Sequence, residues 1–435
     1  MYSESRLEFA SPADDISSHQ EAINYPPLAI VTSIYGSRDG SKLILDNKAV
    51  EGFKLYAEYW PGEVIWLLVL RDEPPSYSSS YDAENLPFKV VEVNADCSDV
   101  IQKIPKDSLL IAGADNFNCF FLASVIPERL VYIIEYTIRT RFDILRSSTK
   151  PFLKKLRSAV WEILTEIKRR RAIAAASGLQ CNGLPSYQLY GPRSRNAMQY
   201  FDTRLSKSWC IENTALLAKQ NRMRNGAPLH LAFSGRLNRM KGAHYLPSLI
   251  NYLEAAGLDF VFEIFGEGEL SEELQVKAKS SKVILHGPQT FPDEWVPAMK
   301  ERIDLFICPH PQGDPSCTYM ETLGCGVPIV GFANEAWRLM AAGHNFGYAV
   351  PVGSVKALAK VILQLNKNRN LLAEMATAAA AFGSSHSTEV AFLKRVEHLK
   401  EIQRARFAAA IPRVENVMSN DEYKSHDSKS QAISV

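Results

Sequence analysis

The sequence predicts an α/β protein made of two doubly wound, Rossmann-like domains in tandem. Short apolar runs alternate with helical patterns over residues 27–190, and the same alternation returns over residues 229–384. This alternation is typical of parallel sheets that carry helices on both faces. With 435 residues, 46% of them hydrophobic and 22% charged, the chain is long enough for two globular domains of ordinary composition.

Charge and cysteine content exclude several classes of protein. The formal net charge is +1, so no overall field favours nucleic acid. The seven cysteines form no C-x-x-C pair and several lie in apolar runs, which indicates reduced thiols in a cytoplasmic protein rather than disulfides or a zinc site. The polar amino terminus is unlike a signal peptide, and no apolar run is long enough to span a bilayer.

The first domain follows a flexible arm, residues 1–26. Its clearest helix is 149–171, where Pro151 suits a first turn and apolar residues recur at helical spacing. Residues 191–228 are polar and irregular, and we interpret them as a linker. The predicted strands are 28–33, 63–70, 88–93, 108–113, 129–135 and 172–183.

The second domain repeats the pattern and ends in a long helix, 385–410, followed by a polar tail, 411–435, that is predicted to be disordered. Its predicted strands are 230–235, 260–266, 282–287, 304–309 and 327–332. Its predicted helices are 242–256, 270–280, 292–302, 319–325, 354–366 and 368–382.

Ligands of open parallel sheets bind where loops leave the carboxyl ends of the strands. The loop FSGRLNRMKG follows the first strand of the second domain. Gly235 permits a tight turn, and Arg236 and Lys241 place two cations beside the start of a helix. Such a loop suits a diphosphate, although two surface cations on a loop would give the same pattern.

A second loop of this kind is FGEGEL, where Gly266 ends a strand in a Gly-x-Gly turn. The third glycine of a dinucleotide fingerprint is missing, because position 271 is Ser. We interpret Gly266 as a turn that allows close approach of a ligand, with a plain turn as the alternative.

The stretch GDPSCTYMETLGCG carries the strongest pattern. Ser316, Cys317 and Thr318 would present backbone N–H groups at a helix start, which is a second anion site. Glu321 lies one turn further on, where a carboxylate can accept hydrogen bonds from a vicinal diol such as a ribose.

Taken in order, this domain contains SGRL…KG, FGEGE, VILHG, DLFICP…GDPSCTYMETLGCGVPIVG and HNFGYAVP. It thereby resembles the donor half of glycosyltransferases with the GT-B fold, and most closely the retaining family 4. The resemblance covers residues 229–410 well and 27–190 by architecture only. It implies two domains facing a cleft, a C-terminal helix that crosses back to the first domain, and a nucleotide-sugar donor of the UDP or GDP type.

The resemblance also implies roles for single residues. Arg236 and Lys241 match the pair that neutralises the leaving diphosphate, Glu321 matches the ribose ligand, and the amides of 316–318 match the phosphate-binding helix start. It implies no cofactor and no metal, and the sequence contains no D-x-D motif.

Two departures from the family pattern concern the sugar and the acceptor. The E-x7-E signature would require Glu at position 313, but Gly313 stands there and Asp314 follows one place late. Either a shifted Asp314 or a backbone amide would then contact the sugar ring. Related enzymes often carry a His at a strand end of the first domain, where this chain offers Asp115 as a candidate catalytic residue. Asp115 could align the acceptor hydroxyl or contact the donor sugar, or it could equally cap the next helix.

Two further features of the first domain are candidates for contact with an acceptor. The loop 33–42 contains Gly36 and Arg38, and we expect it to face the cleft or to be a surface loop. Glu135 and Arg139 follow a later strand and are candidate acceptor contacts.

Residues 138–171 hold eleven Lys or Arg and three acids, interleaved with aromatic residues. This pattern suits the surface of an anionic membrane. The alternative is a solvated helix whose apolar stripe belongs to the core.

The sequence therefore predicts a retaining, metal-independent glycosyltransferase that uses a saccharide or a lipid-linked acceptor. We expect it in polysaccharide or glycoconjugate synthesis, in the cytoplasm or at the inner face of a membrane. The alternatives are a nucleotide-sugar epimerase of the same fold and a non-catalytic subunit that has lost its donor site.

Overall fold

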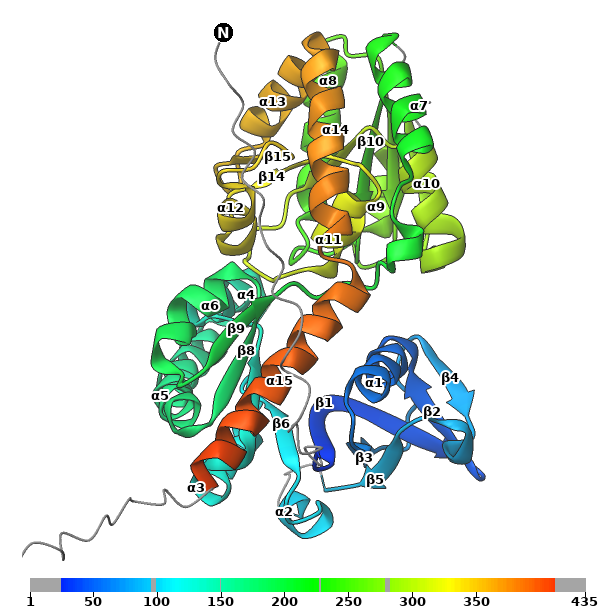
Figure 1. Ribbon diagram of the computed structural model, residues 1–435. Helices are drawn as coiled ribbons and strands as arrows, with labels where there is room; N and C mark the ends of the chain where they lie inside the picture. Colours follow the sequence, from blue (N-terminus) through cyan, green and yellow to red (C-terminus); the bar gives the residue numbers. More distant parts are fainter. Residues whose placement is uncertain (1–24, 95–98, 149, 227, 278–281, 411–435) are drawn as a thin grey trace, which may run out of the picture.

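The computed structural model describes residues 25–94, 99–148, 150–226, 228–277 and 282–410. Two α/β domains lie one above the other in Figure 1. The doubly wound architecture predicted from the sequence is confirmed. The predicted tail, 411–435, and nearly all of the predicted arm, 1–26, lie outside the described residues.

The first domain is built on parallel strands in the order β5-β3-β1-β6-β7-β8-β9. Apolar side chains fill both of its faces, as expected for a sheet covered on both sides. The strands are β1 (Leu28–Asp39), β3 (Val64–Leu70), β5 (Lys89–Glu92), β6 (Leu109–Gly113), β7 (Leu130–Ile134), β8 (Gly178–Asn182) and β9 (Ala197–Tyr200). The predicted boundary at 190 is therefore too early, because β9 still belongs to this sheet.

The predicted loop 33–42 is wrong, because β1 continues through it. β1 turns back at Gly40 (φ +59°) into the antiparallel strand β2 (Lys42–Asp46), which pairs in turn with β4 (Ser78–Tyr81). The polar residues of this stretch gave no apolar run that would have indicated a strand. They form a hairpin that extends the sheet.

Helices cover both faces of the first sheet. They are α1 (Asn47–Tyr59), α2 (Val100–Lys103), α3 (Leu122–Val125), α4 (Ile138–Ser147), α5 (Phe152–Ala175) and α6 (Leu184–Tyr190). Asp46 begins α1, because its Oδ1 accepts a hydrogen bond of 2.8 Å from the N–H of Ala49.

The second domain has a parallel sheet in the order β12-β11-β10-β13-β14-β15. This order reverses direction between β10 and β13, so their exit loops flank the point where such sheets bind ligands. The strands are β10 (Leu229–Ser234), β11 (Phe260–Phe265), β12 (Val283–Gly287), β13 (Leu305–Cys308), β14 (Ile329–Phe332) and β15 (Gly347–Val350). The helices are α7 (Asn213–Arg224), α8 (Leu246–Ala255), α9 (Ser271–Lys277), α10 (Val296–Glu301), α11 (Cys317–Gly324), α12 (Glu335–Ala341), α13 (Val355–Lys367) and α14 (Arg369–Ser384).

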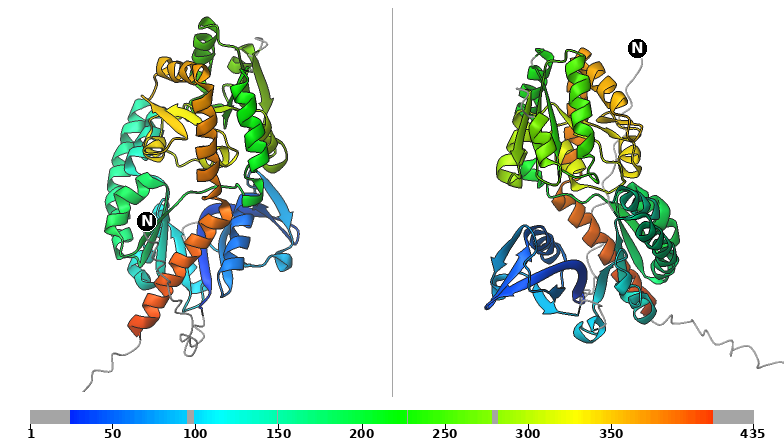
Figure 2. Two further views of the ribbon diagram at one scale, coloured as in Figure 1. Left: turned by 45° about the horizontal axis from the view of Figure 1, so that its top comes forward. Right: turned by 180° about the vertical axis from the view of Figure 1, so that it is seen from behind.

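The last helix, α15 (Thr388–Ala410), leaves the second domain and crosses back over the first (Figures 1 and 2). Its apolar side chains join the core of the first domain, and a Cβ at Gly178 would lie 2.3 Å from Ile402. Arg395 and Gln180 exchange two hydrogen bonds of 2.9 Å across this contact. The predicted crossing helix is thus present and tightly packed.

The structure contradicts the alternative in which the apolar stripe of α5 belongs to the core. The stripe faces solvent, and the buried side of the helix includes Thr165, Glu166 and Arg169. Among the described residues, no helix combines the length and apolar character needed to span a bilayer.

Candidate functional site

The centre of the site is the start of α11, at the exit of β13. Ser316 is the N-cap residue, but its side chain makes no capping bond to the helix and instead donates a hydrogen bond of 3.3 Å to Thr318 Oγ1. The N–H groups of the first turn of any helix have no partner within that helix. A helix start of this kind suits an anion, and the anion site expected here stays a prediction.

Lys241 reaches this region from the loop after β10. Its Nζ lies 2.8 Å from Asp314 Oδ2, and both side chains are largely buried. The loop is held down at Gly242 (φ +77°), where a Cβ would lie 1.9 Å from the carbonyl oxygen of Pro309. The structure thus brings Lys241 and Asp314 together beside α11.

Arg236 lies on the same loop as Lys241 but is exposed to solvent. Gly235 before it has φ +146°, which favours glycine. Gly266 is explained by packing within the protein, because a Cβ there would lie 2.2 Å from the carbonyl oxygen of Gly235. The close approach expected at Gly266 is therefore an approach of two loops of the same sheet.

Glu321 is 1% exposed and forms a two-pronged ion pair with Arg204. Arg204 Nε donates to Glu321 Oε1 at 2.8 Å, and a terminal nitrogen of Arg204 donates to Oε2 at 3.2 Å. The guanidinium also lies 4.0 Å above the ring of Phe291. Sequence reasoning missed Arg204, because it lies in the connection between the domains, far from Glu321 along the chain.

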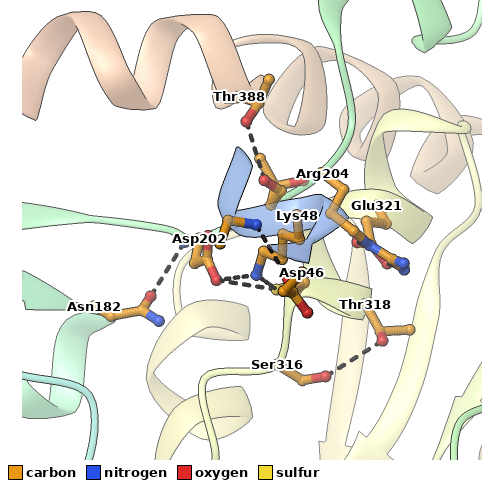
Figure 3. Close-up of polar contacts among 12 residues, drawn as sticks. Asp46, Lys48, Asn182, Asp202, Arg204, Ser316, Thr318, Glu321 and Thr388 are labelled. Carbon is orange, nitrogen blue, oxygen red and sulfur yellow. Dashed lines mark hydrogen bonds and ion pairs between the residues drawn. The ribbon is translucent and has the colours of Figure 1, made fainter. Parts of the chain in front are cut away.

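A second network, which includes Lys48 and Asp202 (Figure 3), joins the two domains. Lys48, on α1 of the first domain, pairs with Asp202 and lies 3.0 Å from Cys317 Sγ. The Cys317 thiol donates to Asp202 Oδ2 at 3.2 Å. Burial opposes the charge on Lys48, but Asp202 outweighs it and holds the Lys48 pKa well above its usual value.

The same contacts keep Asp202 ionised and Cys317 protonated. Burial would raise the pKa of Asp202, but the Lys48 ammonium lowers it below its usual value. Burial, with Asp202 nearby, raises the pKa of the Cys317 thiol. Cys317 therefore acts here as a neutral hydrogen-bonding group.

Gly313 stands where the family signature has its first acid, and the structure shows why no side chain fits. A Cβ there would lie 2.7 Å from Thr140 Oγ1 and 2.8 Å from Glu335 Cβ. Glu335, at the start of α12, accepts hydrogen bonds from Thr137 and Thr140 at the start of α4. The two domains thus pack against each other at the position of the missing acid.

Asp115, at the exit of β6, is engaged within its own domain. It pairs with Arg141 and accepts a hydrogen bond of 2.8 Å from the N–H of Glu135. Burial raises the pKa of Asp115 in spite of the Arg141 charge. The carboxyl group ties β6 to the exit of β7 and does not cap the next helix.

Glu135, at the exit of β7, faces the charges of the interdomain region. Burial raises its pKa to about 8, and Asp115, Asp202 and Asp314 add to the shift. At neutral pH this carboxyl group is mostly protonated and can donate a hydrogen bond. Arg139, the other candidate from this segment, is exposed.

Gly36 and Arg38 lie in β1 and not in a loop. Gly36 is buried, and a Cβ there would lie 3.0 Å from both Leu45 and Leu68. Its lack of a side chain serves packing inside the first domain. Arg38 is exposed and pairs in register with Leu43 of β2.

His310 is a further polar group that the sequence did not single out. It is 1% exposed, follows β13, and neither ring nitrogen has a hydrogen-bond partner among the described residues. Burial, with the Lys241 charge nearby, holds its pKa well below the usual value. His310 is therefore neutral beside the cation of the site.

Comparison with known proteins identifies the second domain. Residues 228–368 match the model of a family described as glycosyl transferases group 1. This segment is therefore similar to a glycosyl transferase group 1 domain. It begins just before β10 and ends just after α13, so it contains both the loop that carries Lys241 and the start of α11.

A curated relative is named "Putative colanic acid biosynthesis glycosyltransferase WcaL", from Salmonella typhimurium. It is 24% identical over 150 residues, which are 33% of this chain and 37% of that protein. The match thus spans little more than a third of the relative.

Solved structures with the same two-domain fold include Alr3699/HepE of Anabaena in complex with UDP, with a TM-score of 0.57. The two sequences are 15% identical, and the match covers 86% of this chain and 99% of that one. Sucrose-phosphate synthase of Thermosynechococcus elongatus has a TM-score of 0.60 at 12% identity, over 88% and 100% of the two chains. At these identities the likeness concerns the fold, which is GT-B.

Proposed function

We propose that this protein is a retaining glycosyltransferase of family 4 that moves a sugar from a nucleoside diphosphate to a saccharide or lipid-linked saccharide. The observation that carries the proposal is the placement of Lys241 beside the uncapped start of α11, within the glycosyl transferase group 1 domain. WcaL, by its name, belongs to colanic acid biosynthesis, and HepE binds UDP. A role in polysaccharide or glycoconjugate synthesis with a UDP or GDP donor accords with both.

In this proposal the diphosphate lies on the amides of Cys317 and Thr318 and on Lys241, with Arg236 closing over it from the exposed loop. Asp314 holds Lys241 until the diphosphate takes over the ammonium. Glu321, oriented by Arg204, accepts hydrogen bonds from the ribose hydroxyls.

The chemical step breaks the bond between the sugar C1 and the phosphate oxygen and forms a bond from the acceptor oxygen to C1. Negative charge grows on the leaving diphosphate, which accepts the acceptor proton. A cation and oriented amides stabilise that charge more in the transition state than in the ground state. Neutral Glu135 donates a hydrogen bond to a sugar hydroxyl in the cleft. The proposal assigns no metal to this step, and among the described residues no cluster of three or more His, Cys, Asp or Glu suits one.

The test starts with the melting temperature of the full chain in UDP, GDP and ADP. A ligand at a hundred times its Kd stabilises the folded state by about 2.7 kcal/mol. We expect UDP or GDP to raise the melting temperature, and Lys241→Ala to abolish the rise, while Lys360→Ala on the exposed side of α13 leaves it unchanged. No rise with any nucleotide would favour the subunit without a donor site.

The matching sugar nucleotide is then incubated with oligosaccharide acceptors, with and without EDTA. NMR of the new linkage should show the anomeric configuration of the donor, and EDTA should not change the rate. Conversion of the sugar nucleotide into its epimer without an acceptor would contradict glycosyl transfer and favour the epimerase.

A further inference from the structure

Helix α5 exposes its apolar side and buries polar residues, the reverse of an ordinary surface helix. Phe152 is 78% exposed and Leu153 76% exposed, and from Leu156 to Ile167 about half of each large apolar side chain is exposed. The exposed apolar residues are Phe152, Leu153, Leu156, Val160, Trp161, Ile163, Leu164 and Ile167, and we call them the α5 stripe.

The buried side of α5 is held by polar contacts. Arg169 donates a hydrogen bond of 3.0 Å to the carbonyl oxygen of Ala114 and pairs with Glu166. The hydroxyl of Tyr190 donates to Glu166 at 3.0 Å. Because these contacts fix the orientation of α5, the helix cannot turn its stripe inward without leaving buried charges unpaired.

The exposed side and the buried side of α5 also differ in charge. Lys154, Arg157, Lys168 and Arg171 are exposed, whereas Glu166 is buried and the Oε2 of Glu162 is buried. The exposed side of α5 is thus apolar and cationic.

An open groove of about 550 Å³ continues this surface between α3 and α5. Phe117, Phe120 and Phe121 contribute to its walls, together with Lys168 and Arg171. Lys168 Nζ lies 5.0 Å above the ring of Phe117, and that ring lies 5.2 Å from Trp161. The groove therefore offers an apolar wall with two cations at its edge.

We propose that the α5 stripe and this groove dock the protein on the surface of an anionic lipid bilayer. The apolar side chains enter the boundary between headgroups and acyl chains, and the cations meet lipid phosphates. Figures 1 and 2 show α5 at the outer edge of the first domain, so a flat surface can approach it. The inference does not depend on the donor or on the reaction.

Charge complementarity favours a bilayer over a second copy of this chain. In a symmetric dimer the same patch meets itself, so the exposed cations of one α5, such as Arg157 and Lys168, would face a second α5 whose exposed charges are also cations. An anionic bilayer neutralises those cations and covers the apolar residues at the same time.

The test measures sedimentation of the full chain with vesicles of phosphatidylcholine alone and of equal parts of phosphatidylcholine and phosphatidylglycerol. We expect binding to the anionic vesicles only, and weaker binding as salt is raised. Leu156→Glu combined with Leu164→Glu should abolish binding, while the matched control Leu217→Glu, 57% exposed on α7, should bind normally.

Arg157→Gln combined with Lys168→Gln should weaken binding roughly thirtyfold, since each cation contributes ~1 kcal/mol and ~1.4 kcal/mol is tenfold.

Each variant is checked for an unchanged melting temperature. The variant Trp161→Phe tests whether the α5 stripe itself enters the bilayer. The tryptophan emission of the parent protein should shift to shorter wavelength on anionic vesicles, and this shift should shrink in Trp161→Phe. Failure of the parent to sediment with anionic vesicles would overturn the proposal. So would a dimer in light scattering that Leu156→Glu with Leu164→Glu converts into monomer, because the stripe would then be covered by a second copy.

Discussion

The strand exits of the two domains differ in the charge of their side chains. In the second domain, the loops after β10 and β13 bring Lys241 and Asp314 to the start of a helix whose side-chain cap is missing. In the first domain, Asp115 is neutralised by Arg141 and Glu135 is held mostly protonated by its surroundings at neutral pH. This difference supports our proposal that a diphosphate binds to the second domain, and that the strand exits of the first domain bind an uncharged sugar.

Removal of one cation from each domain should change kcat very differently in the two cases. We expect Lys241→Ala to lower kcat by about 10² to 10³, because one preorganised charge at the leaving group contributes on the order of 3 kcal/mol. The matched change in the first domain, Arg38→Ala, should leave kcat within about twofold of the parent. Steady-state rates with the donor found by thermal shift check both values. An equal loss of kcat in both variants would contradict the expected difference between the two domains.

The next effect concerns the ion pair between Glu321 and Arg204. Removal of one partner of a buried pair costs 3–5 kcal/mol, and the half-exposed Arg204 recovers part of its hydration, so we expect Glu321→Ala to cost about 2 kcal/mol. Urea unfolding measures the loss, with the exposed Glu301→Ala as control. Glu321→Gln should retain most of the stability and still bind nucleotide less tightly; if it bound as tightly as the parent, Glu321 would be a structural residue only.

Gly313 allows the domain contact itself to be tested. Gly313→Ala places a methyl group 2.7 Å from Thr140 Oγ1 and 2.8 Å from Glu335 Cβ, so we expect a loss of about 1 to 2 kcal/mol. Gly113→Ala is the control, because a Cβ at that position meets no atom within 4 Å. Equal unfolding midpoints for the two variants would show that the domains do not stay packed at Gly313 in solution.

The smallest effect is a dependence of stability on pH. The pKa of Glu135 rises from 4.5 to about 8 on folding, so between these values the folded protein keeps a proton that the unfolded chain releases. The contribution of Glu135 to the free energy of unfolding is therefore fully present below pH 4.5 and is lost as the pH rises to about 8. We expect Glu135→Gln to raise the melting temperature by ~2 °C or more at pH 8 and to change it little at pH 4.5. The exposed Glu84→Gln serves as control, and a rise at both pH values would contradict the assignment.

The sequence predicted the second domain better than the first, for a physical reason. Its buried parallel strands are short apolar runs with glycine or proline beside them, and β11 and β12 fall within a residue or two of their expected bounds. The second half of β1 could not be found in this way, because SIYGSRD is polar and becomes a strand only through pairing with β2 and β3.

The site was predictable where its residues share a loop and not where they meet across the fold. Lys241, Asp314 and the start of α11 follow from local patterns at two neighbouring strand exits. Arg204 and Lys48 reach the same region from segments more than a hundred residues away. The periodicity of α5 showed one apolar side but could not tell which side faces the domain, because that depends on the contacts of Arg169 and Glu166.

In the proposed function the second domain binds a diphosphate at the start of α11. A crystal structure of the full chain with the nucleoside diphosphate that stabilises it most would show where the diphosphate binds. We expect phosphate oxygens within hydrogen-bond distance of the amides of Cys317 and Thr318 and of Lys241 Nζ, with Asp314 released from that ammonium. A diphosphate bound elsewhere, with the pair of Lys241 and Asp314 intact, would contradict it.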